Sequence, residues 1–353
     1  MAYAKKTAKN EAYQKLKTDL KEGNPLGNAY LFYGEESYLR EYYLGEIRKT
    51  LIPAGFEEFN YHALEGKDLT AQSLTEMAEA MPMMAERTLI VVTDWDIYKL
   101  NEDQRERFIA LLEDLPEYCC LVLYYDTAEW KPNGTMRKLN EVFQTKCERV
   151  EFGKQSERDL VAWIQRHFKA HEKWADDRLC QYLIFLTDGT MTTLAGEIEK
   201  VASYAKGQEI TKGDMDAVVI PALSAQTFDI SNAIADGNYD AALRKLQDLY
   251  AMQTEPILIL GAIGSQLRRL LYAKTVMNAG QGQQALMELT GMKSYPAGLT
   301  MNAARRIGDG FCRRAVELCL QADRDMKASR DDPERVLEVL LAALAQEARS
   351  GTR

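Results

Sequence analysis

Apolar positions in the first 150 residues fall into short continuous runs, separated by longer stretches with helical spacing. The runs are rich in β-branched and aromatic side chains, as is typical of strands buried on both faces of a parallel sheet. Strands are expected at residues 30–33, 59–63, 88–93, 120–125 and 149–152. Helices are expected at residues 10–21, 37–50, 70–81, 102–112 and 135–143. Strands that alternate with helices of this length predict a doubly wound α/β domain.

After residue 153 the strand-like runs stop and only helical periodicity remains. Ser156 is expected to cap a helix that ends near Ala170, because Glu157 and Asp159 favour its positive end. Further helices are expected at residues 176–186, 192–206, 210–219, 227–235, 239–252, 256–277, 300–328 and 333–348. Pro221 begins a third region. A chain of 353 residues is too long for one core. We therefore predict an α/β domain at 1–153, a small helical domain at 154–220 and an all-α domain at 221–353.

The composition is that of a globular protein, with 46% hydrophobic and 27% charged residues. The formal net charge is −9, whereas a protein that holds DNA with its whole surface is usually basic. Contact with nucleic acid must therefore be local or shared with partners. Apolar runs fall short of the roughly 20 residues that span a bilayer, and residues 1–10 lack the apolar part of a secretory signal. We expect a cytoplasmic protein without a membrane partner.

Cysteine and histidine give no sign of a metal site or a nucleophile. The six cysteines lack paired metal-ligand spacing, so we expect thiols that line cores in a reducing compartment. His167 and His171 are four residues apart on an expected helix, without the acidic residue of a zinc protease between them. We expect solvent-facing or capping roles for them. No catalytic site and no metal ligands are predicted.

The strand at 30–33 and the helix after it have the layout of a nucleotide-binding loop, but the loop lacks the required residues. A phosphate loop needs several glycines, a lysine, and a serine or threonine. From Gly34 to Arg40 the chain reads Gly-Glu-Glu-Ser-Tyr-Leu-Arg, with one glycine and no lysine. Glu35 and Glu36 would repel a triphosphate. We expect them to stabilise the helix by dipole and capping, and we expect no bound cofactor.

A metal-dependent ATPase also needs an acidic pair after an apolar strand. Here Asp94 follows the strand at 88–93, and the next residue is Trp95 rather than Glu. Asp94 is therefore predicted to be a turn residue, not a magnesium ligand. An active P-loop ATPase with a degenerate loop is kept as an alternative.

Residues 80–87 read Ala-Met-Pro-Met-Met-Ala-Glu-Arg and join an expected helix to an expected strand. Methionine adapts its shape and fills a partner's pocket as well as a core. From the sequence alone, packing of these methionines on the sheet is favoured. An apolar plug presented to a partner is the alternative.

Basic residues gather locally in the all-α region. Arg268, Arg269 and Lys274 form a basic face opposite an apolar stripe, and a second cluster comprises Arg305, Arg306, Arg313 and Arg314. A solvated face of an amphipathic helix is the favoured interpretation. Contact with DNA is the alternative, with Arg268, Arg269, Arg305 and Arg306 as the candidates. A DNA-binding helical adaptor unrelated to replication is therefore also considered.

Taken in order, these segments resemble the delta subunit family of the bacterial DNA polymerase III clamp loader. The resemblance covers residues 26 to 344. It is carried by residues 30–36, 80–87, 194–204, 227–234, 255–260, 266–268, 322–323, Lys327, Asp331 and 337–340.

The resemblance implies an AAA+-like module without ATPase activity, made of the α/β domain and a small helical lid, followed by a helical collar. It implies that Met83 and Met84 match the apolar plug, typically Leu-Phe, which enters a hydrophobic pocket of the sliding clamp and opens the ring. The implied partners are the clamp (beta), the gamma/tau and delta prime subunits of a hetero-pentamer, and primed DNA. No intrinsic catalytic site is implied, although the subunit works within the polymerase III holoenzyme. The implied location is the cytoplasm, at the nucleoid.

Overall fold

The computed structural model describes residues 2–328 and 332–350 and divides into two compact units, 1–155 and 156–353. Asp331, which helps to carry the resemblance, lies outside the described residues.

A parallel five-stranded sheet in the order β2-β3-β4-β1-β5 forms the centre of the first unit. The strands are β1 (Ala29–Tyr33), β2 (Tyr61–Glu65), β3 (Thr88–Thr93), β4 (Cys119–Tyr124) and β5 (Glu148–Glu151). The central strands β1, β3 and β4 are buried along almost their whole length, as their continuous apolar runs predict. Phe32 of β1 lies beside Tyr124 of β4 and Val150 of β5.

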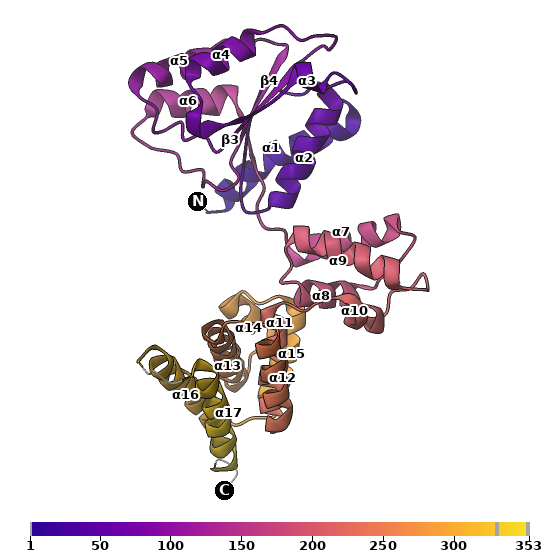
Figure 1. Ribbon diagram of the computed structural model, residues 1–353, viewed down its shortest axis with the longest axis vertical. Helices are drawn as coiled ribbons and strands as arrows, with labels where there is room; N and C mark the ends of the chain where they lie inside the picture. Colours follow the sequence, from indigo (N-terminus) through magenta and orange to yellow (C-terminus); the bar gives the residue numbers. More distant parts are fainter. Residues whose placement is uncertain (1, 329–331, 351–353) are drawn as a thin grey trace. The chain divides into compact units, whose positions relative to one another are not determined.

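Helices cover both faces of this sheet, so the α/β prediction is confirmed (Figure 1). One face carries α4 (Ala71–Glu79), α5 (Glu102–Glu113) and α6 (Arg137–Lys146), whose apolar residues share one core with the strands. The other face carries α1 (Ala2–Glu22) and α2 (Ser37–Leu51). A single helical turn, α3 (Glu57–Asn60), and a 3₁₀ turn, η1 (Gly66–Asp68), flank β2.

Two boundaries in this unit differ from the sequence prediction. The strand expected at 59–63 is wrong at its start, because Phe59 and Asn60 belong to α3 and β2 begins at Tyr61. The carbonyl of Phe56 accepts hydrogen bonds from both the backbone N–H of Asn60, at 3.2 Å, and its side-chain amide, at 3.0 Å. These bonds close a helical turn. The first helix also begins near Ala2 rather than at residue 10.

The second unit is entirely helical in the described residues apart from one isolated bridge, and its early helices match the prediction. Ser156 caps the first of them, since its Oγ accepts from the N–H of Asp159 at 3.2 Å. The helices are α7 (Glu157–Ala170), α8 (Asp177–Leu186), α9 (Met191–Tyr204), α10 (Lys212–Val218), α11 (Leu223–Ala235), α12 (Tyr239–Ala251), α13 (Pro256–Asn278), α14 (Gln283–Thr290), α15 (Ser294–Arg305), α16 (Asp309–Ala328) and α17 (Pro333–Ser350).

The single helix expected at 300–328 is wrong, because α15 and α16 are separate and a break at 306–308 lies between them. Arg306 ends α15, and its Nε is 2.8 Å from Oδ1 of Asp236. A tertiary ion pair thus coincides with the break. Helix α14 was not expected; it ends at Gly291, whose φ of 70° is left-handed.

Residues 156–220 and 221–353 pack together in this unit. The rings of Tyr182 and Phe185 on α8 lie 5.5 and 5.6 Å from the ring of Tyr295 on α15. The Glu157 carboxylate accepts from the backbone N–H of Ser294 at 2.9 Å and from its hydroxyl at 2.6 Å. Division of this unit into a lid and a collar stays a prediction.

The six cysteines are free and buried, as expected. Burial raises the pKa of Cys119 to about 11 and that of Cys120 to about 12, so these thiols stay protonated at neutral pH. Among residues 2–328 and 332–350, there is no cluster of three or more side chains that could hold a metal ion. Across the same residues, none of the helices has the length and apolarity to cross a membrane.

Candidate functional site

The loop at residues 82–86, called the methionine loop below, projects its apolar side chains into solvent. It connects the end of α4 to the start of β3. Met83 is 52% exposed and Met84 is 76% exposed. The interpretation that these methionines pack on the sheet is therefore wrong. Neighbouring exposed apolar side chains on a loop are typical of a surface that binds another molecule.

The side chain of Asn60 holds the backbone at the start of this loop. Its Oδ1 accepts from the N–H of Met83 at 2.8 Å, and its Nδ2 donates to the carbonyl of Met83 at 2.8 Å. Asn60 is fully buried. The next residue, Met84, has a left-handed backbone with a φ of 53°. The sequence does not reveal this role of Asn60, because the surrounding residues predict a strand and no motif marks the position.

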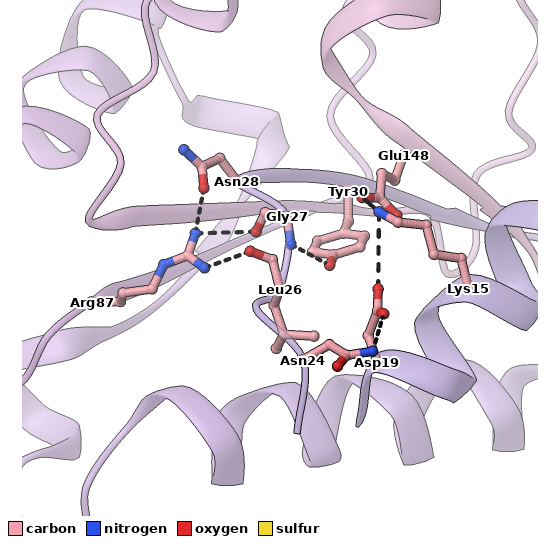
Figure 2. A network of polar contacts seen from close by, with 9 residues as sticks. All are labelled: Lys15, Asp19, Asn24, Leu26, Gly27, Asn28, Tyr30, Arg87 and Glu148. Atoms are coloured by element: carbon pink, nitrogen blue, oxygen red, sulfur yellow. Dashed lines mark hydrogen bonds and ion pairs between the residues drawn. The ribbon is translucent and has the colours of Figure 1, made fainter. Parts of the chain in front are cut away.

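Arg87 holds the other end of the loop, at the amino-terminal edge of the sheet (Figure 2). Its guanidinium donates to the carbonyls of Leu26 and Gly27 at 2.8 and 3.1 Å, and to Oδ1 of Asn28 at 2.7 Å. It also donates to the carbonyl of Cys119 at 3.2 Å. One side chain thus ties the exit of the loop to the segment that leads into β1 and to the start of β4.

The same edge continues into a second set of polar contacts around Tyr30 (Figure 2). The Tyr30 hydroxyl accepts from the N–H of Gly27 at 2.7 Å. Burial, with a further contribution from the Glu148 carboxylate, raises the pKa of Tyr30. Lys15 of α1 pairs with Glu148 and lies 3.9 Å from Asp19. In the segment before β1, Gly27 is therefore held on both sides, with its carbonyl bonded to Arg87 and its N–H to Tyr30.

The turn after β1 packs closely against the segment that follows β5. Gly34 has a φ of 124°, and a Cβ there would collide with the backbone of Phe152. The N–H of Glu36 donates to the carbonyl of Phe152 at 2.9 Å, and the N–H of Phe152 donates to the carbonyl of Tyr33 at 2.7 Å. A phosphate loop directs such N–H groups at the ligand. Here the segment after β5 occupies one of them.

Arg40 lies in the crevice where a doubly wound sheet ordinarily binds its ligand, beyond the carboxyl ends of β1 and β4. It is almost completely buried. Its guanidinium donates to the carbonyl of Gly34 and to Oδ1 of Asp126, the latter at 2.9 Å. The protein therefore fills this place with its own ion pair, between the buried Arg40 guanidinium and the exposed Asp126 carboxylate.

The capping role expected for Glu36 is wrong in one respect. Glu36 occupies the N-cap position of α2, but its side chain makes no capping hydrogen bond. Glu35 is exposed, and its carboxylate pairs with the Lys154 ammonium at 2.7 Å. Stabilisation by the helix dipole stays a prediction for both.

Asp94 is a turn residue, as predicted. Its backbone is left-handed, with a φ of 52°, and its carboxylate accepts from the N–H groups of Asp126, Thr127 and Ala128 at 2.8, 3.0 and 3.1 Å. The Thr127 hydroxyl adds a bond of 2.6 Å. Partial burial raises the pKa of Asp94, but these hydrogen bonds outweigh it and leave the pKa below its usual value.

We expect Asp94→Asn to lower the free energy of unfolding at neutral pH by about 1–3 kcal/mol, because the amide cannot accept all these bonds. A depressed native-state pKa contributes stability above the unfolded-state pKa of about 3.9, which is lost as the pH falls through the native value. Urea unfolding across pH should therefore show the two proteins converging in acid. Asp96→Asn, at an exposed carboxylate paired with Lys99 at 2.7 Å, is the control and should change stability little. Equal effects of both substitutions would contradict the role of Asp94.

The candidate DNA-facing arginines occupy two places in the second unit and have different surroundings. Arg268 is exposed on α13, and Arg269 beside it is partly buried. Burial lowers the pKa of Arg269, and the charge of Arg268 acts in the same direction. Arg305 is exposed and donates to Asn302 at 2.8 Å. The charge of Arg306 is met by Asp236.

Lys274, from the same basic stretch, is mostly buried and lies 3.7 Å from Asp309. The basic face expected on α13 is therefore reduced to its arginines.

Comparisons with known proteins agree over most of the chain. Residues 30–147 match the family model described as "DNA polymerase III, delta subunit", and residues 224–344 match "DNA polymerase III delta subunit, C-terminal domain". The chain is 23% identical over 320 residues to the DNA polymerase III subunit delta of Bacillus subtilis, covering 89% of this chain and 92% of that protein. For the Escherichia coli subunit the identity is 22% over 319 residues, covering 89% and 90%.

A solved structure shows the same fold. It is the Bacillus subtilis DNA clamp loader delta protein, which superimposes with a TM-score of 0.58 at 22% identity. The match covers 94% of this chain and 99% of that one.

Proposed function

The chain belongs to the DNA polymerase III delta subunit family, and from this premise we propose that it binds the sliding clamp through Met83 and Met84 and opens the ring for loading onto primed DNA. The observation that carries the proposal is the exposure of two adjacent methionines on a loop held at both ends. The direct test is a titration of the full chain against the immobilised clamp, compared with a variant in which both methionines are alanine.

The free energy available from this loop is sufficient for the role. Burial of two methionine side chains in an apolar pocket contributes roughly 3 to 5 kcal/mol before ordering costs. The loop opens the ring if its pocket is better formed in the open state, because a ligand shifts an equilibrium only by its differential affinity. Methionine in place of the usual leucine and phenylalanine keeps the apolar character of the plug.

The proposal includes a place in a clamp-loader complex. Family membership implies such a complex, with a clamp and other loader subunits; we propose gamma/tau and delta prime as the pentamer partners. Residues 1–153 and 154–220 would form the AAA+-like module, and 221–353 the collar. Arg268 and Arg305 are the better placed of the four arginines to face primed DNA, because both are exposed. Arg269 is partly buried, and Arg306 is already paired with Asp236. Clamp loading by this complex takes place in the cytoplasm, at the nucleoid.

The chain is proposed to do this without hydrolysing ATP. The ion pair between Arg40 and Asp126 and the bond from Glu36 N–H to Phe152 support this, as do the carboxylates at positions 35 and 36. ATP is then used by other loader subunits, which expose or hide the methionine loop.

We expect no saturable binding of a fluorescent ATP analogue with Mg²⁺ to the isolated full chain up to about 1 mM. The reason is that the turn has no lysine for a phosphate, and the N–H of Glu36 already donates to Phe152. Arg40→Ala is expected to leave this result unchanged, since Glu35 and Glu36 still repel the ligand. Saturable micromolar binding by the unmodified chain would instead favour an ATPase with a degenerate loop.

A further inference from the structure

We propose that Asn60 is a positioning residue that fixes the backbone of Met83 in its binding conformation before the partner arrives. The inference rests on the proposed function of the methionine loop. Asn60 is buried and contributes no surface to a partner, so its substitution can affect binding only indirectly.

The side-chain amide of Asn60 both accepts a hydrogen bond from the backbone of Met83 and donates one to it. The amide pairs with both backbone groups of Met83 at 2.8 Å, as a neighbouring strand would do. Its third bond, from Nδ2 to the carbonyl of Phe56 at 3.0 Å, fixes the side chain itself to α3. The orientation of the amide is settled, because its oxygen meets a donor and its nitrogen meets two acceptors.

The loop needs such a support, because its backbone is not self-sustaining. Met84 is left-handed, with a φ of 53°, and a non-glycine residue in that region persists only where its surroundings enforce it. Asn60 fixes the loop at Met83, and Arg87 fixes its other end. Only three residues lie between these two fixed points: Met84, Ala85 and Glu86. A loop that is already ordered loses less conformational entropy on binding and so binds more tightly.

The first measurement is the affinity of full-length Asn60→Ala for the immobilised sliding clamp. We expect binding to be about 10-fold weaker than that of the unmodified chain. The matched control is Asn140→Ala, which removes another bridging amide of the same unit: Asn140 accepts from the Tyr98 hydroxyl and donates to the Asn133 carbonyl, both at 2.7 Å. We expect the control to keep its affinity for the clamp.

The second measurement is amide hydrogen exchange of the free chain, which separates positioning from general destabilisation. In Asn60→Ala the peptide over residues 82–86 should exchange at least about 10-fold faster, because the N–H of Met83 loses its acceptor. Exchange in β3 (Thr88–Thr93) should not change. If Asn60→Ala fails to fold, Asn60→Ser replaces it in both measurements. Serine keeps a donor for the carbonyl of Phe56 but is too short to bond with both backbone groups of Met83.

The inference is overturned if the affinity is unchanged, if residues 82–86 exchange at the same rate, or if β3 loses protection together with the loop. The failure of the proposed function looks different. In that case the variant with both methionines replaced would still bind the clamp, whatever Asn60→Ala does. If the methionine variant loses binding and the Asn60 variant does not, only the positioning role is wrong.

Discussion

Replacing Met83 and Met84 together with alanine is expected to weaken binding to the sliding clamp by about 100-fold or more. Both side chains are exposed in the free chain, so the fold does not depend on them. Each loses roughly 1.5–3 kcal/mol of burial in the partner's pocket, and every 1.4 kcal/mol corresponds to a factor of ten in affinity. The measurement is surface plasmon resonance with the full chain and the immobilised clamp.

The chain supplies a matched control for this variant two residues earlier. Met81 is 81% exposed, more than either residue of the pair, and it precedes Pro82. We expect Met81→Ala to change the affinity by less than about threefold, because general apolar exposure is not what the clamp recognises. Undiminished binding by the double variant would rule out the plug, and an equal loss in Met81→Ala would show that it extends beyond two residues.

Arg87→Met is expected to lower the stability of the first unit by about 2–4 kcal/mol, measured as the free energy of unfolding in urea. Its guanidinium serves three carbonyls and one side-chain amide oxygen, from Leu26, Gly27, Asn28 and Cys119. Methionine fills part of the volume but donates no hydrogen bond. A buried carbonyl that loses its donor still has the full free-energy cost of desolvation, without a hydrogen bond to offset it.

The control for this variant is Arg107→Met in the same unit. Arg107 is exposed on α5, with Nε 3.0 Å from the Asp103 carboxylate and Nη1 2.9 Å from Oε1 of Gln72. Exposed pairs of this kind contribute little, so we expect a change within about 0.5 kcal/mol. If the two substitutions lowered the free energy of unfolding by similar amounts, the hydrogen bonds of Arg87 would contribute no more to stability than those of an exposed arginine.

Local sequence was enough to predict the sheet. The runs at 88–93 and 120–125 are so continuously apolar that only strands buried on both faces accommodate them, and both lie in the centre of the sheet. Local sequence failed where a tertiary partner decides. Asn60 belongs to a helical turn rather than a strand, and its side chain bonds to Met83, 23 residues away. Helical spacing continues through 306–308, where the helix nevertheless breaks and Arg306 pairs with Asp236.

The two methionines of the site could be predicted from the sequence, but their exposure and the residue that positions them could not. Methionine suits a core and a pocket equally well, so only the structure establishes that Met83 and Met84 are exposed. The bonds between Asn60 and Met83 join residues 23 apart in the chain, and the Arg40–Asp126 pair joins residues 86 apart. No local periodicity encodes contacts over such separations, and no motif marks Asn60 or Asp126 as a partner.

The left-handed backbone of Met84 limits which residue types can replace methionine at that position during evolution. A β-branched side chain at positive φ is a strained outlier, so valine and isoleucine are poor replacements despite their apolar character. Unbranched or γ-branched residues such as methionine, leucine and phenylalanine carry a smaller penalty. Related sequences should therefore have flexible or aromatic apolar residues at position 84, and not β-branched ones. The backbone conformation thus restricts substitution there independently of the need for an apolar side chain.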